Sequence, residues 1–377
     1  MRVPAVLLTL LVLTGCAAAP VAASASCEPG SGARSTVEYA ENFALRYEDG
    51  YQVLTVNEPS PGASAESYVL VSCGAVPALP PELASAQQIS VPVDSLYSGS
   101  TTHLPLLVDL QRLDVLTGVA TAGFVSSPEV RERIDSGAVA EYAPTERIAV
   151  ERVVAGRPDV LMTGGFDDPA YAALRSAGVP VVANAEYLEP TPLGRAEWIK
   201  VMAALTGDEL RAAEVFDEVE AAYEENAALA ARAAPVPVLA GSLFEGVWSV
   251  PAGGSYLGRM LADAGGANPW ADDPSTSSLT LDFETVYARG GQAPIWLATQ
   301  DWATRADALA TDPRYGELAA MQDGRTWTAN RAVGPGGGND FYERGVTRPD
   351  LVLADLVAIL HPELVPDHEF TFYRELR

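Results

Sequence analysis

Few of the residue types that commonly do chemistry occur in this sequence of 377 residues, and they do not cluster. Three histidines and three cysteines are present, and no HExxH, GxSxG or CxxC pattern is found. A bare zinc or manganese ion needs several ligands converging on one point, and a hydrolase needs a nucleophile beside a base. We therefore expect no metal centre, no cofactor and no enzyme, with an exported cleft hydrolase as the alternative.

Two short segments invite a catalytic or phosphate-binding interpretation. Asp167 and Asp168 precede a proline, and this pattern is typical of a helix N-cap. We therefore prefer an N-cap to a catalytic carboxylate site here. The segment 334–340, GPGGGND, lacks the Lys-Ser/Thr pair of a phosphate-binding loop. Its glycines predict instead a mobile or closely packed loop at the mouth of a cleft.

The charge and the N-terminus bear on where the protein works. A formal net charge of −26 excludes the basic face that nucleic acids require. Arg2 precedes the apolar run 3–13, which is too short to span a membrane and has the layout of a secretory signal. The run ends in LTGC, which resembles the bacterial lipobox. That resemblance implies removal of residues 1–15 and a lipid on Cys16; a plain signal peptide is the alternative.

The segment behind this cysteine, residues 16–36, is rich in Ala, Ser, Gly and Pro and is expected to be a flexible tether. Cys27 and Cys73 are the two other cysteines. An even number of cysteines beside Cys16 in an exported chain suggests a disulfide between them, although two free thiols are also consistent with the sequence.

Apolar periodicity organises residues 37–190. The segment 42–56 has two alternating halves around Glu48-Asp49-Gly50, which predicts a β-hairpin, and the segment 66–74 predicts a third strand. From residue 88 onwards, strands alternate with helices. This alternation predicts a parallel sheet with helices on both faces.

Residues 191–234 contain no predicted strand. One helix is expected to end at Gly207, and a second over 208–233 would be a rod of roughly 39 Å. Its apolar stripe consists of Leu210, Ala213, Phe216, Val219, Tyr223, Ala227 and Ala230. The strand–helix alternation resumes over 235–377. The sequence thus predicts an α/β fold of two parallel-sheet lobes joined by one long helix, with an N-terminal β-hairpin preface.

Five segments, in their order, give residues 85–377 a resemblance to a known family. They are STTHLPLL (100–107), VERVVAGRPDVLM (150–162), GGSYLGRMLADAGGANPW (253–270), LDFETVYARG (281–290) and GVTRPDLVLADLVAILHPEL (345–364). With the lipobox and the joining helix, they resemble the substrate-binding lipoproteins of ABC importers for iron-siderophore complexes, haem and cobalamin. The resemblance implies the class III periplasmic-binding-protein fold. It also implies a monomer, lipid-anchored outside the cell membrane or periplasmic, that delivers its ligand to an ABC permease.

In that family, a glutamate on the outer surface of each lobe meets arginines of the permease. Matching the segments residue by residue gives Glu151 and Glu284. Two acids held apart by a rigid helix would set the register of docking. The alternative is that each is only an exposed acid favoured by the dipole at a helix N-terminus.

Ligands of open α/β sheets bind beyond the carboxyl ends of the strands. Those ends are expected at residues 100–103, 121–124, 164–166, 245–256, 299–302 and 331–342. They supply the candidate ligand contacts His103, Phe124, Phe166, Trp248, Tyr256, Trp302, Arg331 and Tyr342. The six aromatic residues could form walls for a large flat or macrocyclic ligand, although local loop packing would explain each equally well. Arg331 could pair with a ligand anion or a neighbouring acid, and His103 could touch a chelate or cap a helix.

The expected ligand is a preassembled metal chelate, because three scattered histidines do not provide for a bare ion. Ferric siderophore, haem and cobalamin all suit an aromatic cleft, and the sequence does not choose among them. His361 and His368 are expected at the surface. A lipid-anchored ligand sensor of the same fold is a further alternative.

Overall fold

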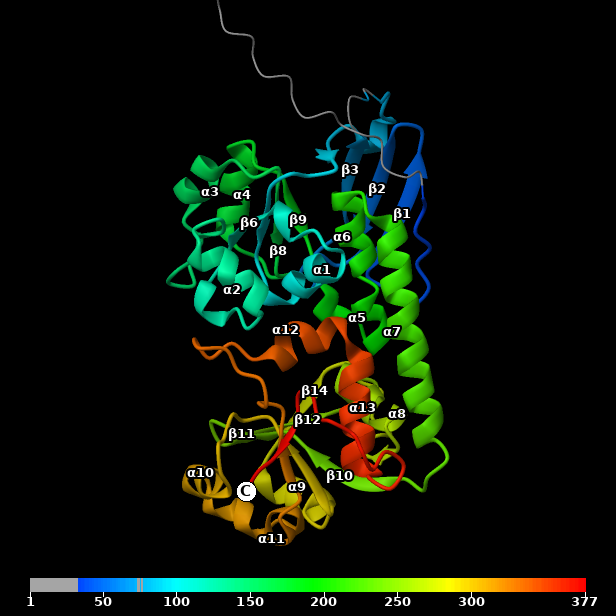
Figure 1. Cartoon of the computed structure of the whole chain (residues 1–377), viewed down its shortest axis with the longest axis vertical. Helices are drawn as coiled ribbons and strands as arrows, with labels where there is room; N and C mark the ends of the chain where they lie inside the picture. Colours follow the sequence, from blue (N-terminus) through cyan, green and yellow to red (C-terminus); the bar gives the residue numbers. More distant parts are fainter. Residues whose placement is uncertain (1–32, 73–74, 76) are drawn as a thin grey trace, which may run out of the picture.

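The computed structural model describes residues 33–72, 75 and 77–377 and contains two α/β lobes, one above the other, beside a long helix (Figure 1). The predicted fold of two α/β lobes is confirmed. The calls on residues 1–15, Cys16, Cys27 and Cys73, and most of the tether 16–36, lie outside the described residues.

The N-terminal lobe has a five-stranded sheet whose order is β7-β6-β5-β8-β9, with every pairing parallel. Its strands are β5 (Leu96–Ser98), β6 (Leu116–Val119), β7 (Ala140–Glu141), β8 (Val160–Thr163) and β9 (Val181–Ala183). Its helices are α1 (Leu104–Asp109), α2 (Pro128–Asp135), α3 (Val150–Gly156) and α4 (Pro169–Ser176). The strand order reverses beside β5, which makes the carboxyl end of β5 a topological switch point.

The C-terminal lobe has a sheet of order β13-β10-β15-β16-β17 and a separate antiparallel sheet of order β11-β12-β14. The first contains β10 (Val236–Ala240), β13 (Gly266–Ala267), β15 (Ile295–Ala298), β16 (Thr326–Thr328) and β17 (Arg374–Glu375). The second contains β11 (Ser242–Phe244), β12 (Val247–Pro251) and β14 (Ser278–Leu281). The helices are α8 (Tyr256–Asp263), α9 (Phe283–Gly290), α10 (Arg305–Thr311), α11 (Ala319–Asp323), α12 (Asp340–Thr347) and α13 (Pro349–Leu360).

Three helices join the lobes: α5 (Pro192–Ala196), α6 (Ile199–Thr206) and α7 (Glu209–Ala230). Gly207 ends α6 with φ +81°, a left-handed conformation that favours glycine. The 22 residues of α7 run along one side of both lobes (Figure 1). Phe216, Val219, Tyr223 and Ala230 are buried, as predicted for the apolar stripe.

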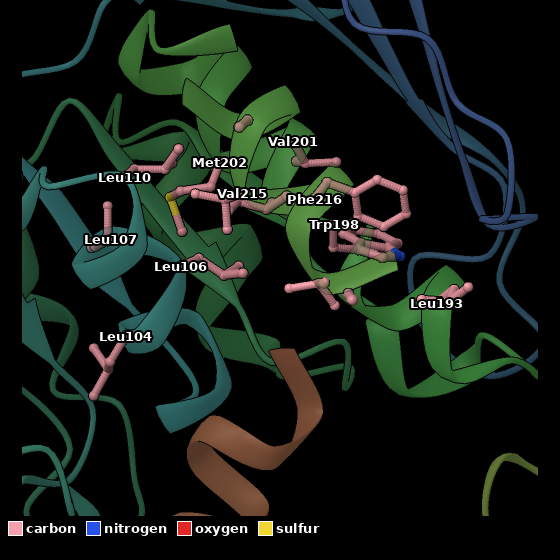
Figure 2. Packing of buried hydrophobic residues seen from close by; sticks show 14 of the residues in the cluster. Leu104, Leu106, Leu107, Leu110, Leu193, Trp198, Val201, Met202, Val215 and Phe216 are labelled. Carbon is pink, nitrogen blue, oxygen red and sulfur yellow. The ribbon is translucent and has the colours of Figure 1, made fainter. Parts of the chain in front are cut away.

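Leu210 does not follow the predicted stripe and is 58% exposed. Ala212 and Val215 are buried in the first turns of α7 instead. They face the core that α7 shares with α6 and α1, where Leu106, Met202 and Val215 lie together (Figure 2). This core fixes the joining helix firmly to the N-terminal lobe.

The N-terminal preface is a four-stranded sheet of order β1-β2-β3-β4. Its strands are β1 (Phe43–Glu48), β2 (Tyr51–Val56), β3 (Glu66–Ser72) and β4 (Gln87–Val91). The predicted hairpin is confirmed, but β4 pairs with β3 rather than beginning the sheet of the lobe. The amide side chain of Gln87 explains this position, because it exchanges two hydrogen bonds with backbone Val181 and so covers the edge strand β9.

Two buried carboxylates attach the preface to the joining helices. Glu197 accepts hydrogen bonds from the backbone N–H groups of residues 38–40 and pairs with Lys200 Nζ at 2.6 Å. Glu189 accepts the next two backbone N–H groups, those of residues 41–42. The preface is therefore part of the N-terminal lobe and is not a loose extension.

Candidate functional site

A cleft of about 650 Å³ lies between the two lobes. The N-terminal lobe lines it with residues that follow β5, β6 and β8, among them Ser100, Thr121 and Phe166. The C-terminal lobe adds residues that follow β15 and β16, including Asp301 and Tyr342. Because β5 is the switch point of the first sheet, this cleft is where an open α/β sheet binds its ligand.

Glycines at the strand ends bring the backbone close to this cleft. A Cβ on Gly99 would lie 2.7 Å from the carbonyl oxygen of Met162, so only glycine fits between β5 and β8 here. Gly165 has φ +76°. It turns the chain after β8 so that the ring of Phe166 stacks on Tyr187, with 4.9 Å between ring centroids.

Large aromatic side chains at the cleft are unusually exposed. Phe124 is 48% exposed, Phe166 64% and Tyr342 51%. Tyr142 and Tyr171 also line the cleft. Exposed aromatic rings gathered around a concavity indicate a binding surface rather than a packed core.

Three carboxylates line the same cleft: Glu146, Asp168 and Asp301. Burial, and then the charge of Asp168, raise the pKa of Tyr171 to about 12. Tyr171 therefore carries a neutral hydroxyl at physiological pH. Glu146 has φ +57°, a left-handed conformation that is strained for a residue other than glycine.

A glycine-rich segment of the C-terminal lobe, residues 334–338, lies against residues 123–126 of the N-terminal lobe. We call it the glycine strap. A Cβ on Gly336 would lie 2.1 Å from the oxygen of Gly123, and one on Gly338 would lie 1.9 Å from the oxygen of Phe124. This is the close packing expected of the segment, and it requires glycine because the neighbouring atoms belong to the backbone.

Beside the strap, one carboxylate joins the lobes. Glu343 of α12 is 1% exposed and accepts hydrogen bonds from the backbone N–H groups of Ser126, at 2.7 Å, and Ser127, at 3.0 Å. Burial raises the pKa of this carboxyl group. We call Glu343 and these two N–H groups the interlobe clasp.

A second cavity of about 700 Å³ lies beyond the strap. It is lined by α1, α2, α12 and the start of the strap, including Arg131, Arg344 and Arg348. Both Arg344 and Arg348 are paired, with Asp340 and Asp350 respectively. This cavity is slightly larger than the cleft. It lies mainly against the sides of helices, with residues 332–335 of the loop after β16 at its edge.

Of the eight candidate ligand contacts, the structure brings Phe124, Phe166 and Tyr342 together in the cleft. Two tryptophans lie elsewhere, contrary to expectation. Trp248 is fully buried and packs against Trp296, and Trp302, 8% exposed, meets the same ring edge-on. The expectation assumed loops at these strand ends, whereas Trp248 belongs to β12 and fills a core of aromatic rings.

The other three candidates also lie outside the lining. His103 is fully buried, with Nδ1 3.0 Å from Ser98 Oγ. Tyr256 stacks under the guanidinium of Arg195, 4.1 Å from the ring centroid, at the junction of α5 and α8. Arg331 is exposed on the loop after β16. Each is near a strand end in sequence, but its side chain is turned to the core or to solvent.

Sequence reasoning missed several lining residues. Tyr142 and Glu146 follow β7, a strand of two residues that is too short to show periodicity. Asp168 is the predicted N-cap of α4, since its Oδ1 accepts the N–H of Ala170 at 2.7 Å. It also lines the cleft, and it lies two residues beyond the strand-end range 164–166.

The two docking glutamates begin helices at the outer ends of the lobes, Glu151 on α3 and Glu284 on α9 (Figure 1). Both are exposed. Glu284 pairs with Arg314 Nη1 at 3.2 Å, and Arg314 also binds Asp312. Among the ion pairs of the described residues, none involves Glu151.

Within residues 33–72, 75 and 77–377, no group of three or more His, Cys, Asp or Glu side chains is placed to hold a metal ion. The helices of this part of the chain include none that is both long and apolar enough to cross a membrane. His361 is 1% exposed, so its expected surface position is wrong, because it packs beneath Gly265.

Two α/β lobes joined by helices along one side, with a ligand-sized cleft at the strand ends, define a two-lobed binding protein. The family model described as periplasmic binding protein matches residues 96–331, and the chain belongs to that family. It is 25% identical over 360 residues to an uncharacterized lipoprotein of Methanocaldococcus jannaschii, covering 91% of this chain and 87% of that protein.

Solved structures show the same fold at low sequence identity. A periplasmic binding protein from Veillonella parvula matches with a TM-score of 0.60 and 13% identity, over 87% of this chain and 98% of that chain. The apo haem-binding protein of Roseiflexus sp. RS-1 matches with a TM-score of 0.55 and 21% identity, over 72% of this chain and 99% of that one. The expected membership in the family of periplasmic binding proteins is confirmed.

Proposed function

We propose that this chain captures a metal chelate in the interlobe cleft and delivers it to an ABC permease. The chelate is a ferric siderophore, haem or cobalamin. The observation that carries the proposal is the cleft itself, which combines a strand-end position with three half-exposed aromatic rings, those of Phe124, Phe166 and Tyr342. Its volume of about 650 Å³ lies within the range of roughly 300–1,000 Å³ usual for small-molecule sites.

The absence of a metal-ligand cluster from the described residues is consistent with cargo that brings its own ligands. A flat or macrocyclic chelate would lie between the rings of the two lobes, with hydroxyl groups and carboxylates at its rim. The haem-binding protein of Roseiflexus sp. RS-1 shares the fold, which supports haem as one of the three candidates.

The proposal includes delivery and anchoring. Glu151 and Glu284 would engage the permease, since they are exposed acids at the outer ends of the two lobes. A lipid on Cys16 would hold the protein at the outer face of the membrane. In this proposal the chain works as a monomer, binds no nucleic acid and catalyses no reaction.

The test is a calorimetric titration of the purified chain with ferric siderophores, haemin and cobalamins. Tryptophan fluorescence is the weaker choice, because none of the six tryptophans is among the residues that line the cleft. Micromolar or tighter binding of at least one chelate is expected, and it should weaken when Phe166→Ala and Tyr342→Ala are combined. Absence of binding to all three classes would overturn the proposal.

A further inference from the structure

The charges of the cleft bear on which chelate it accepts. Its lining includes three carboxylates, on Glu146, Asp168 and Asp301, and no lysine, arginine or histidine among the described residues. We propose that the cleft selects metal chelates of net positive charge over anionic chelates of the same shape. This inference rests on the proposed function, because it takes the cleft as the chelate site.

The three carboxylates are not neutralised from within the protein. None takes part in an ion pair of the described residues. Asp168 Oδ1 accepts the backbone N–H of Ala170 at 2.7 Å, and Asp301 Oδ1 accepts from the amide of Asn339 at 3.4 Å. Both partners are neutral, so a ligand entering the cleft meets uncompensated negative charge.

Three arginines lie on the other side of the glycine strap from the cleft. Arg131, Arg344 and Arg348 line the second cavity and not the cleft. Arg147 follows Glu146 in the chain but is not part of the lining either. An anion in the cleft would therefore find no cationic partner, and its own desolvation would go uncompensated.

The aromatic residues of the cleft also favour a positively charged ligand. The faces of phenylalanine and tyrosine rings attract cations through their quadrupole, and more strongly where water is excluded. Among the described residues, four aromatic rings of the lining are at least partly exposed: Phe124, Phe166, Tyr171 and Tyr342. Tyr142 also borders the cleft, but it is 1% exposed and its ring is stacked on Tyr97. Aromatic faces next to carboxylates form the usual environment for a bulky cation.

Glu146 adds an independent observation. Its backbone is left-handed, with φ +57°, and its N–H donates to the oxygen of Ala143 to close a tight turn. Glycine would adopt this conformation without strain. Among the described residues, Glu146 is one of four residues other than glycine with a positive φ, and it is the one of them that lines the cleft.

The test uses three ferric trihydroxamate chelates that share the same metal cage and differ only in one end group. A free amine gives a charge of +1, an acetylated amine a charge of 0, and a succinylated amine a charge of −1. An iron porphyrin with four N-methylpyridyl groups and one with four sulfonatophenyl groups form a second matched pair. Each is titrated calorimetrically into the purified full-length chain in detergent at pH 7.5.

We expect the cationic member of each series to bind at least about tenfold more tightly than the anionic member, and the difference to shrink in 0.5 M salt. A triple variant replaces the acids together: Glu146→Gln, Asp168→Asn and Asp301→Asn. In this variant the difference in affinity between the cationic and the anionic chelate should fall to about twofold. Asparagine still serves as an N-cap at position 168, so this variant keeps the start of α4.

A matched control removes three exposed acids outside the cleft, by Glu132→Gln, Glu317→Gln and Asp323→Asn. It makes the same change in net charge and should leave the tenfold difference intact. Equal or tighter binding of the anionic chelates would overturn the charge inference while the proposed function stood. Failure of both series, together with haemin and the cobalamins, would overturn the proposed function as well.

Discussion

The backbone N–H of Ser126 donates to Glu343 Oε2 across 2.7 Å, so that a residue of the N-terminal lobe is held by a buried carboxylate from α12 of the C-terminal lobe. Ser127 donates to the other oxygen of the same group at 3.0 Å. Both oxygens of the carboxyl group therefore act as acceptors of backbone N–H groups. They hold the lobes together next to the cleft, beside the glycine strap.

The variant Glu343→Gln should loosen this contact. Glutamine presents only one acceptor oxygen, and its amide would face the second backbone N–H group, so one buried donor loses its partner at a cost of about 1–3 kcal/mol. We expect a larger radius of gyration by small-angle scattering and faster release of a bound chelate. Glu132→Gln, on the exposed face of α2, is the control. An unchanged radius and release rate would show that the clasp does not hold the lobes.

The glycine strap gives a second test of the same junction. The variant Gly338→Ala places a Cβ against the oxygen of Phe124, and backbone atoms on both sides leave little room to relax. We expect the strap to move off residues 123–126 and the midpoint of thermal unfolding to fall, because overpacking costs about 1–3 kcal/mol. Gly123→Ala is the matched control, since nothing lies within 4 Å of its Cβ. Equal effects of the two variants would contradict the packing described for the strap.

Much of the fold could be predicted because periodicity reports burial. The alternating halves around Glu48-Asp49-Gly50 became the hairpin β1–β2, and the acid–helix–break–strand pattern after Glu151 became α3 and β8. The placement of β4 could not be predicted, since Gln87 is a polar residue whose hydrogen bonds to Val181 are visible only in three dimensions.

The site was predictable only in part, for a related reason. The strand-end rule gives positions along the chain, and it found Phe124, Phe166 and Tyr342. It does not give the direction in which a side chain points. Trp248 and His103 occupy similar positions in sequence, but a second small sheet and a buried helix start turn them into the core.

His103 makes the stability of the protein dependent on pH. Burial lowers the pKa of its imidazole to about 3, whereas an unfolded histidine titrates near 6.5. Below about pH 6.5 the unfolded chain therefore binds a proton that the folded chain does not bind. The stabilisation due to neutral His103 is complete above this pH and is lost, at about 1.4 kcal/mol per pH unit, as the pH falls toward 3.

The measurement is urea unfolding at pH 7.5, 6.5 and 5.5 for the natural chain and for His103→Gln. The variant removes this one titration, so its free energy of unfolding should fall less than that of the natural chain between pH 7.5 and 5.5, by about 1.4 kcal/mol. Parallel curves for the two proteins would contradict the role given to the buried imidazole.

The preface should depend on Glu197. This carboxylate accepts three backbone N–H groups from residues 38–40 and neutralises Lys200, which is also buried. Glu197→Gln would leave the ammonium group without its counter-charge, and breaking a buried pair costs about 3–5 kcal/mol. We expect a lower urea midpoint and faster hydrogen exchange in β1. Glu38→Gln, which changes an exposed side chain and keeps the backbone N–H, is the control.

The proposed docking acids differ in one respect that makes their roles separable. Glu284 is 75% exposed but already pairs with Arg314, whereas Glu151 has no ion pair in the described part of the chain. A permease arginine would have to compete with Arg314 for Glu284, and would meet no competitor at Glu151. We therefore expect Glu151→Arg to lower chelate uptake more than Glu284→Arg does, and the double variant to abolish it.

The order of these losses is measured as the uptake of a radiolabelled chelate by cells that also make the permease. Affinity for the chelate should stay unchanged in each variant, because neither acid is among the residues that line the cleft. Arg314→Ala should raise uptake, since it frees Glu284 for the permease. Glu132→Arg and Glu317→Arg place the same charge reversal on exposed positions of α2 and of the segment before α11, and should have little effect. If these control variants lose as much uptake as the docking variants do, the loss is a general effect of surface charge, and Glu151 and Glu284 are not docking residues.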